Sequence, residues 1–207
     1  MDGTLIDSME MISRVDEENF EKLGITPNDE ILDDMRYIPL GESAEYIKEH
    51  FDLPLTAEEI MQVMLDSMIE GYRDVEMKEG VFDYLDFCRK NGIKMAIATA
   101  TEPDLAVDIA KNMGFYGYME AIVSCTDVGA PKNRPDVFIE AARKMGLESS
   151  ECAVFEDGLP GAVSSGEAGF TVVGVYDPTA GEEDSAKLRA ASHRYIKSFR
   201  EIENQLI

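Results

Sequence analysis

The sequence predicts an α/β protein with a doubly wound parallel sheet and an inserted, all-helical cap subdomain. From about residue 80 onward, short apolar segments with strand character alternate with segments of helical periodicity. This alternation is typical of a parallel sheet covered by helices. Between about residues 9 and 79 the chain shows helical periodicity and little strand character. We therefore assign residues 1–8 and 80–207 to the core and residues 9–79 to the cap.

Size and charge narrow the classes of partner. A length of 207 residues suits one domain of moderate size, or a core with an inserted subdomain. The formal charge is −23, from 42 acidic and 19 basic residues. Such a surface repels nucleic acid and anionic lipid, so we expect neither as a partner. A phosphorylated substrate would need local cations, a metal ion or helix N-termini to overcome the same field.

The cysteines and the apolar segments indicate where the protein resides. Cys88, Cys125 and Cys152 follow no metal-ligand spacing and are expected to be reduced thiols. No apolar segment approaches the length of a membrane span, and no signal peptide is apparent. We expect a cytoplasmic protein, either a monomer or a homodimer, with no membrane partner.

Two amphipathic helices are predicted in the cap. The first has apolar residues at helical spacing and a natural stop at Gly24. Its apolar residues are Ile12, Val15, Phe20 and Leu23. The second begins with a capping box in which Thr56 is the N-cap and Glu59 lies three places on. The apolar face that follows consists of Ile60, Val63, Met64, Met68 and Tyr72.

The core is predicted to alternate helix and strand to its end. The expected strands are residues 93–98, 121–124, 153–155 and 171–175, with a last short strand around His193 and Tyr195. The expected helices are residues 81–91, the segment after Pro103, residues 135–145, the segment from Pro160 to Gly169, and a terminal helix over 199–207. Ligands of such sheets bind beyond the C-terminal ends of the strands, so functional residues are expected there.

Polar residues do follow the predicted strands. Thr99 ends one strand and is followed by Ala100, and Glu156 and Asp157 end another. Lys132 stands just ahead of a predicted helix. Taken singly, each has a plainer interpretation: a strand-end Thr is usually a local cap, a loop Lys is usually a solvated charge, and Glu-Asp-Gly is usually a turn.

Taken together and in order, these residues resemble the motifs of the haloacid dehalogenase superfamily. The set is Asp2-Gly3-Thr4, Thr99, Lys132 three places before Pro135-Asp136, and Glu156-Asp157-Gly158. The glycines and alanines after Asp157 match as well, and the similarity spans essentially the whole chain. It points to the phosphoglycolate phosphatase and β-phosphoglucomutase-like branch, whose core carries a helical cap. The resemblance implies Mg²⁺-dependent hydrolysis of a small phosphate ester through an aspartyl-phosphate intermediate.

The resemblance also implies roles for residues at the metal and at the leaving group. Asp2 would be the general acid and base, and its backbone carbonyl would bind Mg²⁺. Glu156 and Asp157 would supply or orient the remaining metal ligands, since Mg²⁺ prefers oxygen donors.

Other roles concern the phosphoryl group and substrate choice. Lys132 would offset negative charge on the nucleophile and the phosphoryl group, and Thr99 and Ala100 would bind phosphoryl oxygens. Substrate choice would belong to the cap, around Arg36 to Ser43.

One expected residue has no counterpart. In the family the nucleophilic Asp stands two places before the position of Asp2, which is one place before Met1. The strand that carries it would be the middle strand of the sheet. Such a strand contributes on the order of 6–12 kcal/mol of burial, comparable with a domain's net stability of about 5–15 kcal/mol. We therefore expect Met1 to be an internal residue of an Asp-Met-Asp-Gly-Thr motif, and a chain that begins there to be inactive and badly destabilised.

Departures from the motifs refine the expected function. Asp2 favours a phosphatase over a dehalogenase or a phosphonatase, which lack this Asp. Ile12 stands where hexose-phosphate mutases carry a cap histidine. Arg134 stands where relatives usually have Ala, and would either add a cation near the phosphate or face solvent. The alternative to an enzyme is a catalytically inert relative that binds phosphorylated ligands or a partner protein.

Overall fold

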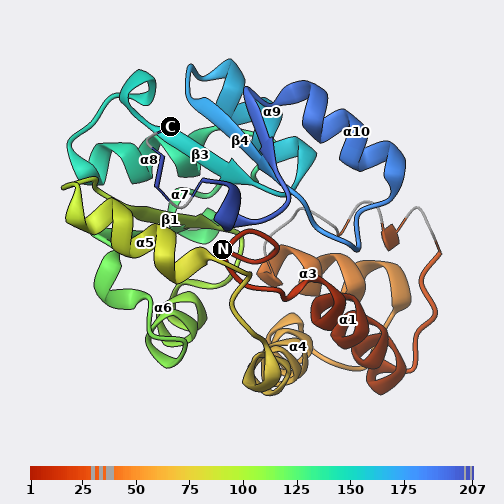
Figure 1. Ribbon diagram of the computed structural model, residues 1–207. Coiled ribbons are helices and arrows are strands. Elements are labelled where there is room, and N and C mark those ends of the chain that lie inside the picture. The colour runs from red at the N-terminus through yellow and green to blue at the C-terminus, as the bar shows by residue number, and fades with distance from the viewer. Residues whose placement is uncertain (29–30, 33–34, 36–39, 203, 206) are drawn as a thin grey trace.

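Figure 1 shows the computed structural model, which describes all residues except 29–30, 33–34, 36–39, 203 and 206. The strands and most helices of the second half form one layered region, and α1, α3 and α4 form a separate group of helices beside it (Figure 1). The N-terminus lies where the two groups meet (Figure 1). Within the described residues, no helix is both long and apolar enough to cross a bilayer.

The helical group consists of α1 (Met9–Leu23), α3 (Leu40–Phe51) and α4 (Ala57–Gly71), followed by a 3₁₀ turn, η1 (Tyr72–Asp74). Helix α1 ends at Gly24, which adopts the left-handed conformation with φ of 69°. Helix α4 begins with the predicted capping box of Thr56 and Glu59. These helices enclose an apolar cluster of their own, formed by Phe20, Leu23, Ile25, Ala44, Ile47, Ile60 and Met64. The division into core and cap agrees with this packing and stays a prediction.

Two connecting segments join the helical group to the layered region, and they run side by side. Ile6 and Met77 form an antiparallel bridge. The amide of Lys78 donates to the carbonyl of Leu5 at 2.8 Å. The Nζ atom of Lys78 donates to the carboxylate of Asp177 at 2.8 Å, and Asp177 is only 3% exposed. The connection is therefore fixed to the layered region by a buried ion pair.

The layered region alternates helices and strands as predicted. Its elements are α5 (Val81–Lys90), β1 (Ala96–Thr99), α6 (Pro103–Asn112), η2 (Tyr116–Tyr118), β2 (Ala121–Ser124), α7 (Cys125–Val128), α8 (Asp136–Met145), η3 (Ser149–Glu151), β3 (Ala153–Glu156), α9 (Leu159–Glu167), β4 (Thr171–Val175), α10 (Glu182–Ala191), β5 (Arg194–Ile196) and η4 (Phe199–Glu201).

All strand pairs are parallel, which confirms the predicted class, but the strands form two sheets. One sheet pairs β1 with β2, with Thr99 opposite Ser124. The other has the order β3-β4-β5, with Glu156 opposite Gly174. Among the described residues, no strand pairs with the second edge of β1 or of β3.

A shared core holds the two sheets next to each other. Ala96 and Ala98 of β1 pack on the same apolar cluster as Val154 of β3. Ile97 and Phe155, which point to the other face of each strand, belong to a second shared cluster. Met1, which is 4% exposed, is part of this second cluster. The unpaired edges of β1 and β3 therefore border the same core region, and the chain's first residue lies within it.

Three predicted boundaries need correction. The strand predicted over 93–98 is Ala96–Thr99, because the amide of Ile93 still donates to Cys88 at the end of α5. The strand predicted over 153–155 includes Glu156. The terminal helix predicted over 199–207 is wrong, because the described residues of this segment, which leave out 203 and 206, form only the 3₁₀ turn η4. Phe199 and Ile202 are buried within this single turn. A helix of so few residues is marginal without further packing.

Candidate active site

The carboxylate of Asp2 is held by three hydroxyl groups from three parts of the chain. Ser8 donates to Oδ1 at 2.8 Å, and Tyr72 donates to the same oxygen at 2.7 Å. Thr101, in the loop after β1, donates to Oδ2 at 2.7 Å. Since Ser8 precedes α1 and Tyr72 follows α4, both ends of the helical group contact the first loop of the chain at Asp2.

The phenol of Tyr72 is well suited to remain a donor. Burial raises its pKa well above the usual value, and the neighbouring charge of Asp2 raises it further. The Tyr72 side chain was predicted only as part of the apolar face of a cap helix. Its hydroxyl group is a site contact that the sequence did not reveal.

Lys132 and Glu156 form a buried ion pair. The Nζ atom of Lys132 donates to Oε1 of Glu156, and the two side chains are 18% and 3% exposed. The second oxygen of Glu156 accepts from the amide of Gly158 at 3.1 Å. Burial by itself lowers the pKa of Lys132, but the attraction of Glu156 and Asp157 outweighs burial, so the pKa is raised. Lys132, in the loop before α8, is therefore a charged side chain paired with Glu156 at the end of β3 and is not a solvated surface charge.

Asp157 lies against the first loop. The hydroxyl of Thr4 donates to Oδ1 of Asp157 at 2.6 Å. Burial and the charge of Glu156 raise the pKa of Asp157 to about 6, although Thr4 and Lys132 act in the opposite direction. Gly3 allows this approach because its φ is 64° and a Cβ atom there would lie 2.1 Å from Oδ2 of Asp157.

The N-terminal ammonium of Met1 completes this cluster. Burial lowers its pKa, and repulsion by Lys132 lowers it further, whereas Asp2, Glu156 and Asp157 raise it. The backbone nitrogen of Met1 is therefore close enough to Lys132, Asp2, Glu156 and Asp157 for their charges to act on it.

Thr99 lies at the end of β1 and is 2% exposed. Its Oγ1 accepts from the amide of Thr101 at 3.1 Å and lies 3.0 Å from Thr101 Oγ1, which in turn contacts Asp2. Thr99 thus forms the local cap that a strand-end Thr usually forms, and also supports a residue that contacts Asp2. Ala100, next in the chain, is exposed.

Arg36 and Ser43 of the cap were predicted to take part in substrate choice. Arg36 lies outside the described residues. Ser43 is on α3 and is 5% exposed, so in this arrangement it is packed within the helical group. Asp16 on α1 is close enough to Tyr72 to raise the pKa of that phenol, and burial raises the pKa of Asp16 itself to about 6.

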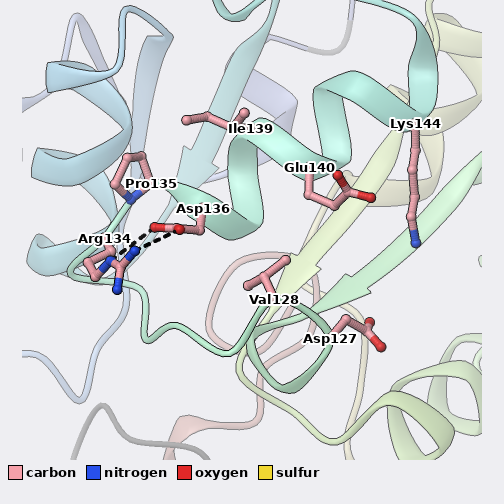
Figure 2. Close-up of a pocket in the computed structure, with 8 residues that line it drawn as sticks. All are labelled: Asp127, Val128, Arg134, Pro135, Asp136, Ile139, Glu140 and Lys144. Carbon is pink, nitrogen blue, oxygen red and sulfur yellow. Dashed lines mark hydrogen bonds and ion pairs between the residues drawn. The ribbon is translucent and has the colours of Figure 1, made fainter.

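A groove of about 770 Å³ lies outside this cluster, between α7 and α8 (Figure 2). It is lined by Asp127, Val128, Arg134, Pro135, Asp136, Ile139, Glu140 and Lys144. Figure 2 shows the guanidinium of Arg134 directed at the carboxylate of Asp136, with N–O distances of 3.2 and 2.9 Å. The Arg134 side chain is 61% exposed. Of the two interpretations of Arg134, the structure favours the solvent-facing one.

A model of the haloacid dehalogenase-like hydrolases matches residues 1–169. The chain belongs to this family. The predicted resemblance to the haloacid dehalogenase superfamily is confirmed by this match.

Similar proteins extend the comparison. Bacillus subtilis YhcW is 26% identical over 137 residues, which cover 66% of this haloacid dehalogenase-like chain and 62% of YhcW. The Drosophila melanogaster protein named probable pseudouridine-5'-phosphatase is 27% identical over 192 residues, covering 90% of this chain and 83% of that protein. The crystal structure of CbbY from Rhodobacter sphaeroides in complex with phosphate has the same fold. It superimposes with a TM-score of 0.79 at 20% identity, covering 97% of this chain and 92% of CbbY.

The haloacid dehalogenase-like site contains some of the donors that Mg²⁺ prefers. Glu156 and Asp157 are adjacent carboxylates, and burial together with the charge of Glu156 raises the pKa of Asp157. A bound cation would offset this repulsion. Within the described part of the chain, no three acidic, cysteine or histidine side chains are grouped as a metal site. The residues present therefore fit part of a magnesium site.

Proposed function

We propose that this protein is an Mg²⁺-dependent phosphatase of a small phosphorylated metabolite, acting in the cytoplasm through an aspartyl-phosphate intermediate. One observation carries the proposal: contacts between side chains connect all four sequence motifs near the C-terminal ends of β1 and β3. Asp2 contacts Thr101 beyond β1, Thr4 contacts Asp157, and Lys132 contacts Glu156. These pairs are separated by 99, 153 and 24 positions in the sequence. The name of the Drosophila relative supports a small phosphate ester as the substrate class.

Each side chain has a role that suits its surroundings. Asp2 transfers the proton to the leaving alcohol and later removes one from water, since its three hydroxyl partners fix the carboxylate. Lys132 remains charged and attracts the phosphoryl group, which is common to all substrates. Thr99 and Ala100, at the end of β1, offer a hydroxyl and backbone groups to phosphoryl oxygens. Arg36 and Ser43 of the cap select the leaving group.

Glu156 and Asp157 hold or orient Mg²⁺ together with the backbone carbonyl of Asp2. When bound, the cation neutralises charge between the attacking carboxylate and the phosphoryl group. The chain's own contribution is to hold two carboxylates side by side, Glu156 buried and Asp157 partly buried, where Lys132 and Thr4 keep each of them oriented.

The nucleophile is an Asp supplied immediately ahead of Met1, at the end of a strand between β1 and β3. Both edges facing this position are unpaired among the described residues. The nitrogen of Met1 lies close to Lys132, Asp2, Glu156 and Asp157. A carboxylate attached there would face the phosphoryl site and would be the additional oxygen donor for the metal.

A substitution at Asp157 tests the metal role. In a form extended upstream by a strand ending in Asp, Asp157→Ala should lower Mg²⁺-dependent hydrolysis of p-nitrophenyl phosphate at least 10-fold, because a charged ligand is lost. The control is Asp136→Ala, which removes an acidic side chain of the outer groove. Unchanged Mg²⁺ dependence in Asp157→Ala would exclude this residue from the metal site.

The second candidate is an inert relative that binds phosphorylated ligands or a partner protein. Its supporting observation is that both oxygens of Asp2 and both oxygens of Glu156 already have donors within the chain. A form extended by the upstream strand that binds inorganic phosphate with Mg²⁺ but hydrolyses no ester would favour this candidate.

A further inference from the structure

Helix α9 contacts both members of the Lys132–Glu156 pair. On the Glu156 side, Gly158 donates its amide, and Gly161 approaches so closely that a Cβ atom would lie 2.7 Å from Cδ and from Oε1 of Glu156. On the Lys132 side, the hydroxyl of Ser164 donates to the backbone carbonyl of Lys132 at 2.6 Å. The N-cap and the first two turns of α9 therefore contact the Glu156 side chain and the Lys132 backbone.

The Ser164 contact is partly buried and connects segments far apart in the chain. Ser164 is 4% exposed, and 32 positions separate it from Lys132. Its other acceptor, the carbonyl of Gly161 in its own helix, lies farther away at 3.3 Å. A buried serine in a helix usually bonds to its own helix, so the shorter bond to another segment is the informative one.

The next residue provides a comparison within the same helix. Ser165 is fully buried, and its hydroxyl bonds to the carbonyls of Gly161 at 2.7 Å and of Ala162 at 3.2 Å. Both acceptors belong to α9 itself. Ser164 and Ser165 therefore have the same side chain and similar burial, but only Ser164 contacts the segment that carries Lys132.

We propose that Ser164 is a positioning residue that fixes the backbone of Lys132, and so holds the Lys132 ammonium between Glu156 and the phosphoryl site. Without this bond the backbone of Lys132 would lose its hydrogen bond to α9, and the side chain would keep its contact with Glu156 of β3. The ammonium already has Glu156 on one side and the Phe138 ring at 5.7 Å on another. Small shifts of the backbone would then change how far the ammonium reaches toward a phosphoryl group. The role in hydrolysis rests on the proposed function.

Position can be measured without any hydrolysis. The probe is the acylation rate of individual lysines in the 207-residue chain under excess acetic anhydride, read by mass spectrometry. Lys78 is the internal reference, because it is also buried in an ion pair, 12% exposed, and held by Asp177 and the carbonyl of Tyr176. General loosening of the fold would raise the acylation of both lysines.

In Ser164→Ala we expect acylation of Lys132 to rise at least 5-fold relative to Lys78, and in Ser165→Ala we expect no change in this ratio. In the form extended by the upstream strand, Ser164→Ala should lower kcat for p-nitrophenyl phosphate about 10-fold, the equivalent of one well-placed hydrogen bond. Ser164→Thr, which keeps the hydroxyl, should recover most of both effects.

The outcomes separate this inference from the proposed function. If Ser164→Ala and Ser165→Ala behave alike in both measurements, Ser164 is not a positioning residue. If Lys132→Ala lowers kcat but Ser164→Ala leaves it unchanged, the inference is wrong and the function stands. If Lys132→Ala leaves kcat unchanged, the proposed role of Lys132 in hydrolysis fails, whatever the acylation rates show.

Discussion

The phenol of Tyr72 donates a 2.7 Å hydrogen bond to the carboxylate of Asp2, across 70 positions of sequence. Tyr72 immediately follows α4, so the end of the helical group touches the proposed acid–base residue directly. Ser8, just before α1, contacts the same oxygen. The position of the helical group and the orientation of Asp2 are therefore linked through two hydroxyl groups.

Removing the Tyr72 hydroxyl should weaken this link. Tyr72→Phe, in a form carrying the upstream strand, is expected to lower turnover of p-nitrophenyl phosphate about 10-fold, because Asp2 loses a donor worth about 1.5 kcal/mol. Steady-state assays measure the change. Tyr84→Phe is the control, since Tyr84 is buried in the core and its hydroxyl group interacts with the Cys88 side chain, away from Asp2. Equal turnover in the two variants would show that the Tyr72 hydroxyl does not orient Asp2.

The close approach of Gly3 to Asp157 predicts a large effect on stability. Gly3→Ala should lower the free energy of unfolding by about 3 kcal/mol or more, through backbone strain at positive φ and a clash with Oδ2 of Asp157. Gly92→Ala isolates the strain, because Gly92 has φ of 69° and a Cβ atom there would meet nothing within 4 Å. Its expected cost is about 1 kcal/mol. Urea unfolding measures the free energy of unfolding of both variants. An equal decrease in the two would contradict the expected clash between a Cβ atom at position 3 and Asp157.

Burial of Asp16 predicts a pH-dependent stability. Its pKa is raised from 3.8 to about 6 by folding, so the folded state binds a proton more tightly than the unfolded state. Protonated Asp16 therefore makes its full contribution to the free energy of unfolding below about pH 4, and this contribution is lost as the pH rises through 6. Asp16→Asn should match the parent chain at pH 4 and be more stable by about 2–3 kcal/mol at pH 8. Thermal melts between pH 4 and pH 8 measure this difference in stability, and Glu17→Gln, at an exposed position, is the control. A stability difference between Asp16→Asn and the parent chain that does not change with pH would contradict the raised pKa of Asp16.

Much of the fold could be predicted because its signals are local. The Thr56 capping box, the stop at Gly24 and the alternation of strands and helices each depend on a few neighbouring residues. The terminal helix was wrongly predicted for a tertiary reason: Phe199 and Ile202 pack into the core within one 3₁₀ turn, and the described residues after them continue no helix. The strands form two sheets, and the middle strand that the motif spacing places ahead of Met1 stays a prediction.

Part of the site could be predicted because some of its residues also stand in local sequence patterns. Lys132, Glu156 and Asp157 stand at recognisable spacings, and the structure brings them together. Tyr72, Thr101 and Ser164 were missed as site contacts because a single hydroxyl in a helix or loop has no distinctive pattern. Only the contacts of Tyr72 and Thr101 with Asp2, and of Ser164 with Lys132, distinguish them from ordinary core or loop residues.

The central claim is that a strand ending in Asp, placed ahead of Met1, completes both the sheet and the catalytic site. The decisive measurement compares the 207-residue chain with a form extended by that strand, assaying Mg²⁺-dependent hydrolysis of p-nitrophenyl phosphate and the melting temperature of each. An acid–base residue alone contributes roughly 10²–10⁴-fold, far less than monoester hydrolysis requires, so the shorter chain should show no turnover. The extended form should gain turnover and thermal stability together, because one segment supplies both. Robust hydrolysis by the shorter chain that is abolished by Lys132→Ala would contradict the account, since another residue would then be the nucleophile.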